Sequence, residues 1–378
     1  MSAGTEKPAS SSQQGSAVYF PALDGLRTIC FVWVVFGHGY VFHPLAELAG
    51  RIANMGVHVF FALSGFLITT LLLRELSRNG RVDLFAFYTR RALRIFPVYY
   101  FALGVGLLGI IALGDRFTHP LGVTTNELNV PLIAVTHGLF VANWFTMPLP
   151  TSLQVLWSIS VEEQFYILFP VTFAASTRRL AAFRPIAIGM LVVLAVRLYL
   201  CMRGDIHENE ISKNTFATGD HLLLGALAAQ LVHVDRERIT RWVRRLGTVG
   251  EVAAFAFVVL LCTWSRDRPA AAYVEASLSA LGCASIVLLI AVGDGWLGRW
   301  FATPWMRRLG QLTYAAYVFH MYPLAVAWAV TAKLGLGVQL AAPLRTLLGV
   351  TGALVVAYLV RITFESRILA WKRRFERA

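Results

Sequence analysis

The chain has little charge, few cysteines and no metal-ligand spacing among them. Only 15% of its 378 residues are charged, and the mean hydropathy is +0.61. These values exclude an ordinary soluble globular protein. The four cysteines occur singly, without a CxxC pair, so we expect no metal and assign them to packing. What remains is a chain built mainly of apolar runs.

Apolar runs of about 18 to 23 residues, each long enough to cross a bilayer as a helix, fill most of the sequence. They are 25–42, 52–73, 95–114, 158–175, 184–202, 217–234, 248–265, 271–293, 310–330 and 341–362. We therefore predict an all-α, polytopic integral membrane protein with about ten transmembrane helices. Residues 1–19 are predicted to be a disordered tail, 20–366 the transmembrane domain, and 367–378 a basic tail.

The positive charge follows the predicted topology. Of 34 Lys and Arg residues, 24 fall on one side of the predicted spans, 7 on the other, and 3 inside them. The richer side holds the N-terminal tail, 74–94, 176–184, 235–247, 294–309 and the end of the chain from Arg361. This asymmetry is the positive-inside pattern, so we expect both termini in the cytoplasm and the protein in the plasma or inner membrane. The net charge of +13 then reflects topology and does not indicate nucleic-acid binding.

One further apolar stretch, 130–145, does not fit this alternation. If it crossed the membrane completely, the basic loop 176–184 would lie outside. We therefore expect 130–145 to be a re-entrant segment or to lie at the outer interface.

The first apolar run, 23–38 (LDGLRTICFVWVVFGH), contains two ionisable groups inside it. Arg27 and His38 are eleven residues apart, so in a helix they lie within about 20° of one another and about 16 Å apart along the axis. Ionisable groups at membrane depth are costly and mark functional sites by default. Asp24 is placed to cap the helix or to pair with Arg27. The alternative for His38 is a neutral imidazole that only packs or accepts a hydrogen bond.

An arginine cluster begins the third run, at 88–100 (YTRRALRIFPVYY). Arg91 and Arg94 share a helix face at i, i+3, and Arg90 lies beside them. Neighbouring guanidiniums suit phosphate groups because they offer planar, bidentate donors that stay charged. The alternative is that these arginines only orient the helix in the membrane.

Two adjacent carboxylates, Glu162 and Glu163, lie near the outer end of the fourth run. Ser158 stacks with Glu162 at i, i+4, and Tyr166 with Glu163 at i, i+3. By the predicted topology they lie at about the depth of His38. A carboxylate that holds one imidazole nitrogen leaves the other free to accept a proton from a hydroxyl. The alternative is a helix start that carries acidic residues near its positive dipole end.

Other polar residues near the predicted outer ends are candidates for binding substrate. His58 begins the second run and is expected near His38, and Tyr317 and His320 share a face of the ninth run. Asp220, at the start of the sixth run, is either a cap or part of an outer cavity. The full set of substrate-binding candidates is His58, Ser64, Trp157, Ser158, Tyr166, Asp220, Tyr317 and His320.

Five motifs in order resemble those of the membrane-bound acyltransferase 3 family. They are LDGLRTICFVWVVFGH at 23–38, GVHVFFALSGFLIT at 56–69, RRALRIFPVYY at 90–100, WSISVEEQFYILFP at 157–170 and LGQLTYAAYVFHMYP at 309–323. The resemblance extends over nearly the whole chain. Two positions depart from the family pattern: His58 stands where Asp is frequent, and Tyr322 precedes Pro323 where Trp is common.

The resemblance implies an integral membrane O-acyltransferase that takes an acyl group, commonly acetyl, from acyl-CoA. The acceptor it implies is a hydroxyl of a sugar, a glycolipid, an envelope polysaccharide or a macrolide-type compound. By position, His38 corresponds to the essential histidine with Arg27 as its partner, and Arg91 and Arg94 to the arginine motif. Glu162 and Glu163 correspond to the acidic motif.

Two mechanisms and one other class of protein stay open at this stage. His38 acts either as a general base, steadied by Glu162 or Glu163, or as a nucleophile that forms an acyl-histidine. The rival class is a transporter of an acyl-group carrier or a lipid-linked sugar. Transporters usually show paired, Gly- or Pro-interrupted helices in two related halves, and we find no such repeat in the sequence.

Overall fold

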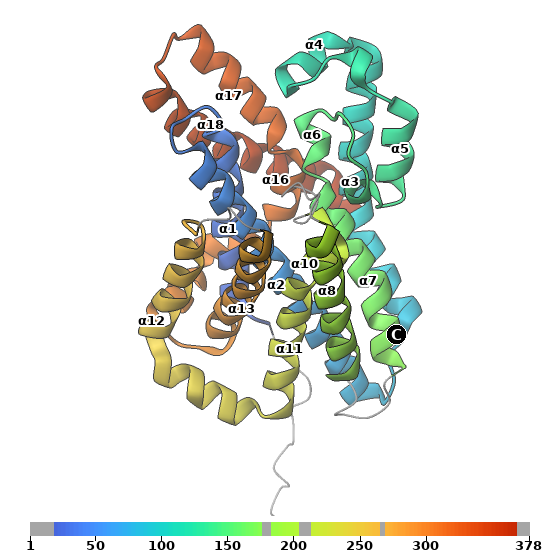
Figure 1. The fold of residues 1–378 in the computed structure, drawn as a ribbon, viewed down its shortest axis with the longest axis vertical. Coiled ribbons are helices and arrows are strands. Elements are labelled where there is room, and N and C mark those ends of the chain that lie inside the picture. Colours follow the sequence, from blue (N-terminus) through green and yellow to red (C-terminus); the bar gives the residue numbers. More distant parts are fainter. Residues whose placement is uncertain (1–18, 176–182, 204–212, 265–268, 369–378) are drawn as a thin grey trace, which may run out of the picture.

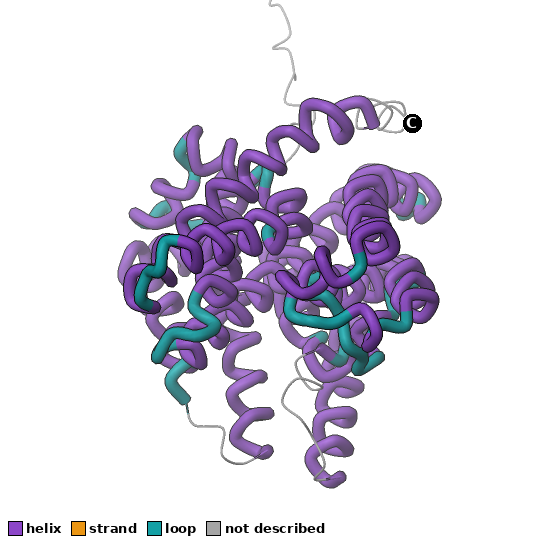
Figure 2. Tube along the Cα trace, turned by 90° about the horizontal axis from the view of Figure 1, so that it is seen from above, coloured by secondary structure: helices purple, strands orange, loops and turns teal. Residues whose placement is uncertain are grey.

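All regular structure in the described part of the chain is helical. The computed structural model describes residues 19–175, 183–203, 213–264 and 269–368, and Figure 2 shows helices joined by loops, with no strand in these ranges. The predicted all-α class is thus confirmed for them. The predicted tails fall almost entirely on 1–18 and 369–378, outside the described residues.

Every predicted span coincides with helix, but not every helix has the length and apolarity of a membrane span. The longer helices are α1 (Pro21–Gly39), α2 (Ala46–Asn79), α3 (Leu84–Leu113), α7 (Trp157–Ala174), α8 (Phe183–Arg203), α11 (Asp220–Val234), α12 (Arg236–Leu261), α13 (Pro269–Val292), α17 (Met321–Lys333) and α18 (Val338–Val360). Within the described ranges, five segments are long and apolar enough to cross a membrane: α2, α3, α8, α13 and α18 with its extension. The count of about ten spans therefore stays a prediction.

Short elements connect these helices. They are α4 (Asp115–Thr118), η1 (His119–Leu121), η2 (Thr125–Glu127), α5 (Val130–Gly138), η3 (Ala142–Trp144), α6 (Thr151–Gln154), α10 (Thr215–Thr218), α14 (Trp296–Phe301), α15 (Pro304–Gly310), α16 (Thr313–Phe319) and the π-helical turn η4 (Arg361–Glu365). In Figure 1, α4, α5 and α6 gather at one end of the molecule. The nine residues of α5 are too few to cross a hydrocarbon core of about 30 Å.

Two predicted spans are bent in the structure. The stretch 310–330 is divided into α16 and α17, which meet at His320 at an angle of 55° and together would form a sixth span. Helix α12 is kinked at Gly247, which has φ 49° and ψ −143°. A positive φ is readily adopted by glycine and costs other residues energy. The first half of α12 consequently lies across the end of the molecule opposite α4 (Figure 1).

Helices α2 and α11 approach unusually closely, and this contact sets the position of α2. Gly65 of α2 faces the backbone of Leu222, and Gly225 of α11 faces the backbone of Ala62. A Cβ atom at either glycine would overlap the carbonyl oxygen opposite. Small residues let two backbones approach in this way within membrane-protein bundles. Ser64, next to Gly65, is thereby held at a defined place.

We expect Gly65→Ala to lower the free energy of unfolding by about 1–3 kcal/mol, because the added methyl forces α2 and α11 apart. Unfolding of the detergent-solubilised protein measures this effect. Gly50→Ala is the matched control in the same helix, because a Cβ at Gly50 meets nothing within 4 Å. That control should be neutral or slightly stabilising. Equal stability of the two variants would contradict the close contact.

Candidate active site

A cavity of about 310 Å³ lies among six segments of the chain and collects most of the predicted site residues. Its lining comes from α1, α2, α3, α7, the 310–317 segment and η4. The polar lining residues are Asp24, Arg27, Ser64, Arg91, Arg94, Ser158, Glu162, Tyr166, Gln311, Thr313, Tyr314, Tyr317, Arg361 and Glu365. Segments from both ends of the sequence therefore meet around one cavity.

Four guanidiniums face this cavity, and they differ in how they are held. Arg27 Nη1 donates to Asp24 Oδ1 at 2.9 Å, as the sequence allowed. The Arg91 guanidinium lies over the Tyr166 ring, 4.5 Å from its centroid. Arg361 Nη2 donates to Gln311 Oε1 at 3.2 Å. Arg94 is exposed, and the structure records no ion pair or hydrogen bond for its side chain within the described ranges.

The remaining polar wall carries a carboxylate and hydroxyl groups. Ser64 Oγ donates to Glu162 Oε1 at 2.7 Å, which joins α2 to α7. Ser158 Oγ lies 2.7 Å from the Tyr317 hydroxyl, which also donates to the carbonyl oxygen of Val155 at 3.1 Å. The cavity thus has an arginine-rich part and a part lined by hydroxyls and one carboxylate.

His38 lies next to this cavity without lining it. Its ring centroid is 5.2 Å from that of His320, and the His320 ring is 5.6 Å from Tyr317, which does line the cavity. His320 Nδ1 lies 2.5 Å from the backbone oxygen of Tyr317, whereas its buried Nε2 has no hydrogen-bond partner among the residues that the structure describes. The bend between α16 and α17 falls at His320, so it turns this imidazole toward His38.

The predicted contact between His38 and a glutamate is absent from the described structure. Glu162 is engaged by Ser64, and Glu163 is buried off the cavity with Oε1 unpaired. Adjacent residues on a helix point about 100° apart, so only one of the two can face the cavity. His320 occupies the place beside His38 that we assigned to a carboxylate.

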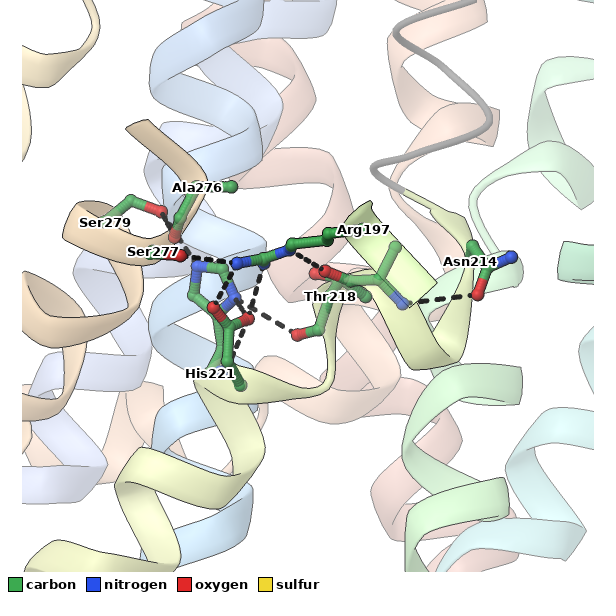
Figure 3. Close-up of polar contacts among 9 residues, drawn as sticks. Arg197, Asn214, Thr218, His221, Ala276, Ser277 and Ser279 are labelled. Carbon is green, nitrogen blue, oxygen red and sulfur yellow. Dashed lines mark hydrogen bonds and ion pairs between the residues drawn. The ribbon is translucent and has the colours of Figure 1, made fainter. Parts of the chain in front are cut away.

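His58 and Asp220 belong to a separate buried cluster and do not line the cavity, so their assignment to substrate binding stays a prediction. Arg197 Nη1 lies 2.8 Å from Asp220 Oδ2, and the His58 ring packs at a tilt of 34° against the His221 ring, with centroids 4.1 Å apart. Figure 3 shows Arg197 reaching Ser277, and His221 bonding to Thr218 and Ser279. A buried charge pair needs such additional hydrogen bonds. This cluster ties α8, α11 and α13 together, and none of its members lines the cavity.

Two more predicted residues lie away from the cavity. Arg90 pairs with Glu75 of α2 at 3.1 Å, because it points about 100° away from Arg91 on the helix. Trp157 packs edge-on against Phe61 with ring centroids 6.1 Å apart. Both contacts join helices around the site, so the assignments of Arg90 to cofactor binding and of Trp157 to substrate binding are not supported by their positions.

Sequence reasoning missed several cavity residues near the end of the chain. Arg361 and Glu365 come from η4, and Gln311 and Tyr314 from the segment before the bend. The i, i+4 spacing of Arg361 and Glu365 was the available signal. This spacing did not indicate a site, because arginines just past the end of a membrane helix are already expected from the topology.

Comparisons with known proteins agree with the resemblance in the motifs. A family model described as "Acyltransferase domain", acyltransferase 3, matches residues 20–362. "Peptidoglycan O-acetyltransferase OatA" of Listeria monocytogenes is 24% identical over 329 residues, which cover 82% of this chain and 50% of that protein. "Putative peptidoglycan O-acetyltransferase YrhL" of Bacillus subtilis is 26% identical over 333 residues, which cover 82% of this chain and 49% of that protein.

The chain spans about half the length of the curated relatives that it matches. No solved structure matches it significantly. The family model covers nearly all of the described residues, including every residue around the cavity except Glu365. The apolar helices and this match together make the chain a multi-pass membrane protein. It belongs to the acyltransferase 3 family.

Proposed function

We propose that this protein is a membrane O-acyltransferase that moves an acyl group, preferably acetyl, from acyl-CoA to a hydroxyl of an envelope glycan or glycolipid. The observation that carries this proposal is the cavity, which four guanidiniums line and which His38 adjoins through His320 and Tyr317. We place the arginine-rich part and both termini on the cytoplasmic side, where acyl-CoA is found. The name of the Listeria relative supports an envelope glycan as acceptor.

In this proposal the arginines hold the phosphates of the donor. Arg94 has no partner among the described residues, and Arg91 Nε is buried without a hydrogen bond, so both have donors left for an anion. Guanidinium–phosphate pairs are strong because they are charged and bidentate. The helical distance from Arg27 to His38, about 16 Å, is of the order of the length of a pantetheine arm. The thioester would then reach the histidine from the arginine side.

His38 is the proposed general base, and His320 takes the positioning role that the sequence suggested for a glutamate. If His320 donates its Nδ1 proton to the Tyr317 carbonyl oxygen, its Nε2 is left as an acceptor beside His38. His38 removes the proton from the acceptor hydroxyl, whose oxygen attacks the thioester carbonyl, and CoA leaves as a thiol. The acyl-histidine route uses the same contacts, with the imidazole nitrogen attacking first.

Glycan and lipid hydroxyls are both compatible with the polar wall of Ser64, Ser158 and Tyr317. A macrolide-type acceptor would use the same hydroxyl chemistry. The transporter alternative has one feature in its favour, because the bend between α16 and α17 resembles the broken helices that line transport sites.

Release of thiol from acetyl-CoA by the purified protein in nanodiscs distinguishes the two classes. We expect release that depends on an added envelope extract and deposits labelled acetyl on a hydroxyl of the acceptor. The mass of the labelled product identifies the acceptor. Repetition with longer acyl-CoAs tests the preference for acetyl. A protein that binds acetyl-CoA but releases no thiol with any acceptor would contradict the proposal and favour transport.

A further inference from the structure

The first half of α12, residues 236–246, forms a basic surface that the proposed reaction does not use. It contains five arginines, at 236, 238, 241, 244 and 245, and a single acidic residue, Glu237. All six of these side chains are exposed. Arg244 lies 3.4 Å from Asp294, whereas no ion pair is recorded for Arg238, Arg241 or Arg245 in the described ranges. The charge on this half-helix is therefore largely uncompensated.

The same half-helix is amphipathic, and its apolar face extends beyond what the protein covers. At 100° per residue, Ile239, Trp242, Val243 and Leu246 lie within one arc of about 100°. Val243 is buried, but Trp242 is 53% exposed. Trp242 lies at the edge of the arc, about 40° from Arg238 and about 60° from Arg245. An exposed indole thus lies beside two arginines for which no carboxylate partner is recorded in the described part of the chain.

The kink at Gly247 lets this segment lie across the end of the molecule, whereas the second half of α12 runs along its length (Figure 1). Exposed aromatic and basic residues continue beside the kink. The backbone N–H of Trp296, which is 56% exposed, donates to Thr248 Oγ1 at 2.9 Å, and Arg299 follows in the same helix. Tryptophan and arginine side chains at the same depth are typical of the boundary between lipid and water.

We infer that residues 236–246 lie on the membrane surface and bind anionic phospholipid headgroups, with Trp242 at the level of the headgroups and Arg238 and Arg245 on the lipid phosphates. An amphipathic helix with arginines on its polar face and a tryptophan at the boundary has the features of interfacial helices. The excess of arginine selects anionic over zwitterionic lipid, because each basic residue near the surface adds attraction. The inference rests on this half-helix and on the residues beside its kink, and it does not depend on the acyl-transfer reaction.

Fluorescence quenching by brominated lipid tests the inference in the intact chain. The protein is placed in nanodiscs of phosphatidylcholine with a minority of phosphatidylglycerol, and one lipid at a time carries bromine. The difference between the wild type and Trp242→Phe isolates the signal of this indole. We expect phosphatidylglycerol to quench that signal more strongly per molecule than phosphatidylcholine does. Arg238→Gln and Arg245→Gln should each lower this preference for phosphatidylglycerol over phosphatidylcholine by about fivefold. Added salt should lower the same preference, because it screens the charges.

Arg116→Gln is the matched control, because it removes an exposed arginine from α4 at the other end of the molecule. It should leave the quenching unchanged. Equal quenching by the two lipids, or an equal effect of Arg116→Gln, would overturn the selectivity. No quenching by either lipid would overturn the placement at the membrane. Unchanged quenching of the other tryptophans and a monodisperse elution profile show that each variant is folded.

Discussion

His38→Ala is expected to lower kcat for thiol release from acetyl-CoA by about 10²- to 10⁴-fold, the usual contribution of a general base. His38 adjoins the cavity through His320 and Tyr317, and His320, the other histidine in this series of contacts, has its Nδ1 at the Tyr317 carbonyl oxygen. Initial rates with the purified protein and its acceptor, measured with a thiol reagent, give the ratio. Acetyl-CoA binding should be retained, because His38 lies away from the arginine-rich part of the cavity.

His119→Ala provides the control for this loss. His119 follows α4, has a side chain that is 58% exposed, and lies outside the cavity. It should keep wild-type activity. Thiol release by His38→Ala at the wild-type rate would remove His38 from the chemistry. Trapping of labelled acetyl on wild-type protein, absent from His38→Ala, would support the acyl-histidine route over direct transfer.

Arg94→Gln is expected to raise KM for acetyl-CoA by about 10- to 100-fold and to leave kcat within a few-fold of the wild type. The expected size follows from the loss of one charged hydrogen bond to a phosphate. A rise in KM alone indicates lost binding that is equal in the ground and transition states. Arg94→Lys should be intermediate, because an ammonium keeps the charge but lacks the bidentate geometry. Steady-state kinetics over a range of acetyl-CoA concentrations measure both constants.

The control for Arg94 lies four residues earlier on the same helix. Arg90 forms an ion pair with Glu75 and does not line the cavity, so Arg90→Gln should leave KM for acetyl-CoA unchanged. Equal rises in KM for the two variants would mean that general positive charge, rather than the cavity, holds the donor. A fall in kcat and thermal stability with unchanged KM would assign Arg94 a structural role instead.

Much of the fold could be predicted from the sequence because helix formation in an apolar chain depends mainly on residues close together in the sequence. Apolar length and periodicity place the helices, and every predicted run overlaps at least one helix in the described ranges. Neither bend follows from that pattern. The break at His320 lies inside a continuous apolar run and depends on how α16 and α17 pack against their neighbours. Gly247 was a visible glycine, but one glycine does not determine whether a helix kinks there.

The candidate site was predictable where two residues share one helix, and unpredictable where the contact crosses helices. The pairing of Arg27 with Asp24 and the common face of Arg91 and Arg94 follow from 3.6 residues per turn. The neighbour of His38 does not, because it lies at the break between α16 and α17, almost 300 positions later in the chain. The contact of His58 with His221 could not be predicted for the same reason, because it joins α2 to α11.

By itself, the sequence determined that this is an all-helical membrane chain with ionisable groups buried in it, because apolar length and charge asymmetry are properties of the chain alone. The order of its motifs was enough to recognise the family. Only the tertiary structure decided that Glu162 engages Ser64, that His320 stands beside His38, and that η4 closes the cavity with a fourth arginine. These pairings depend on the relative rotation and close approach of helices distant in sequence, which the pattern along one helix does not contain.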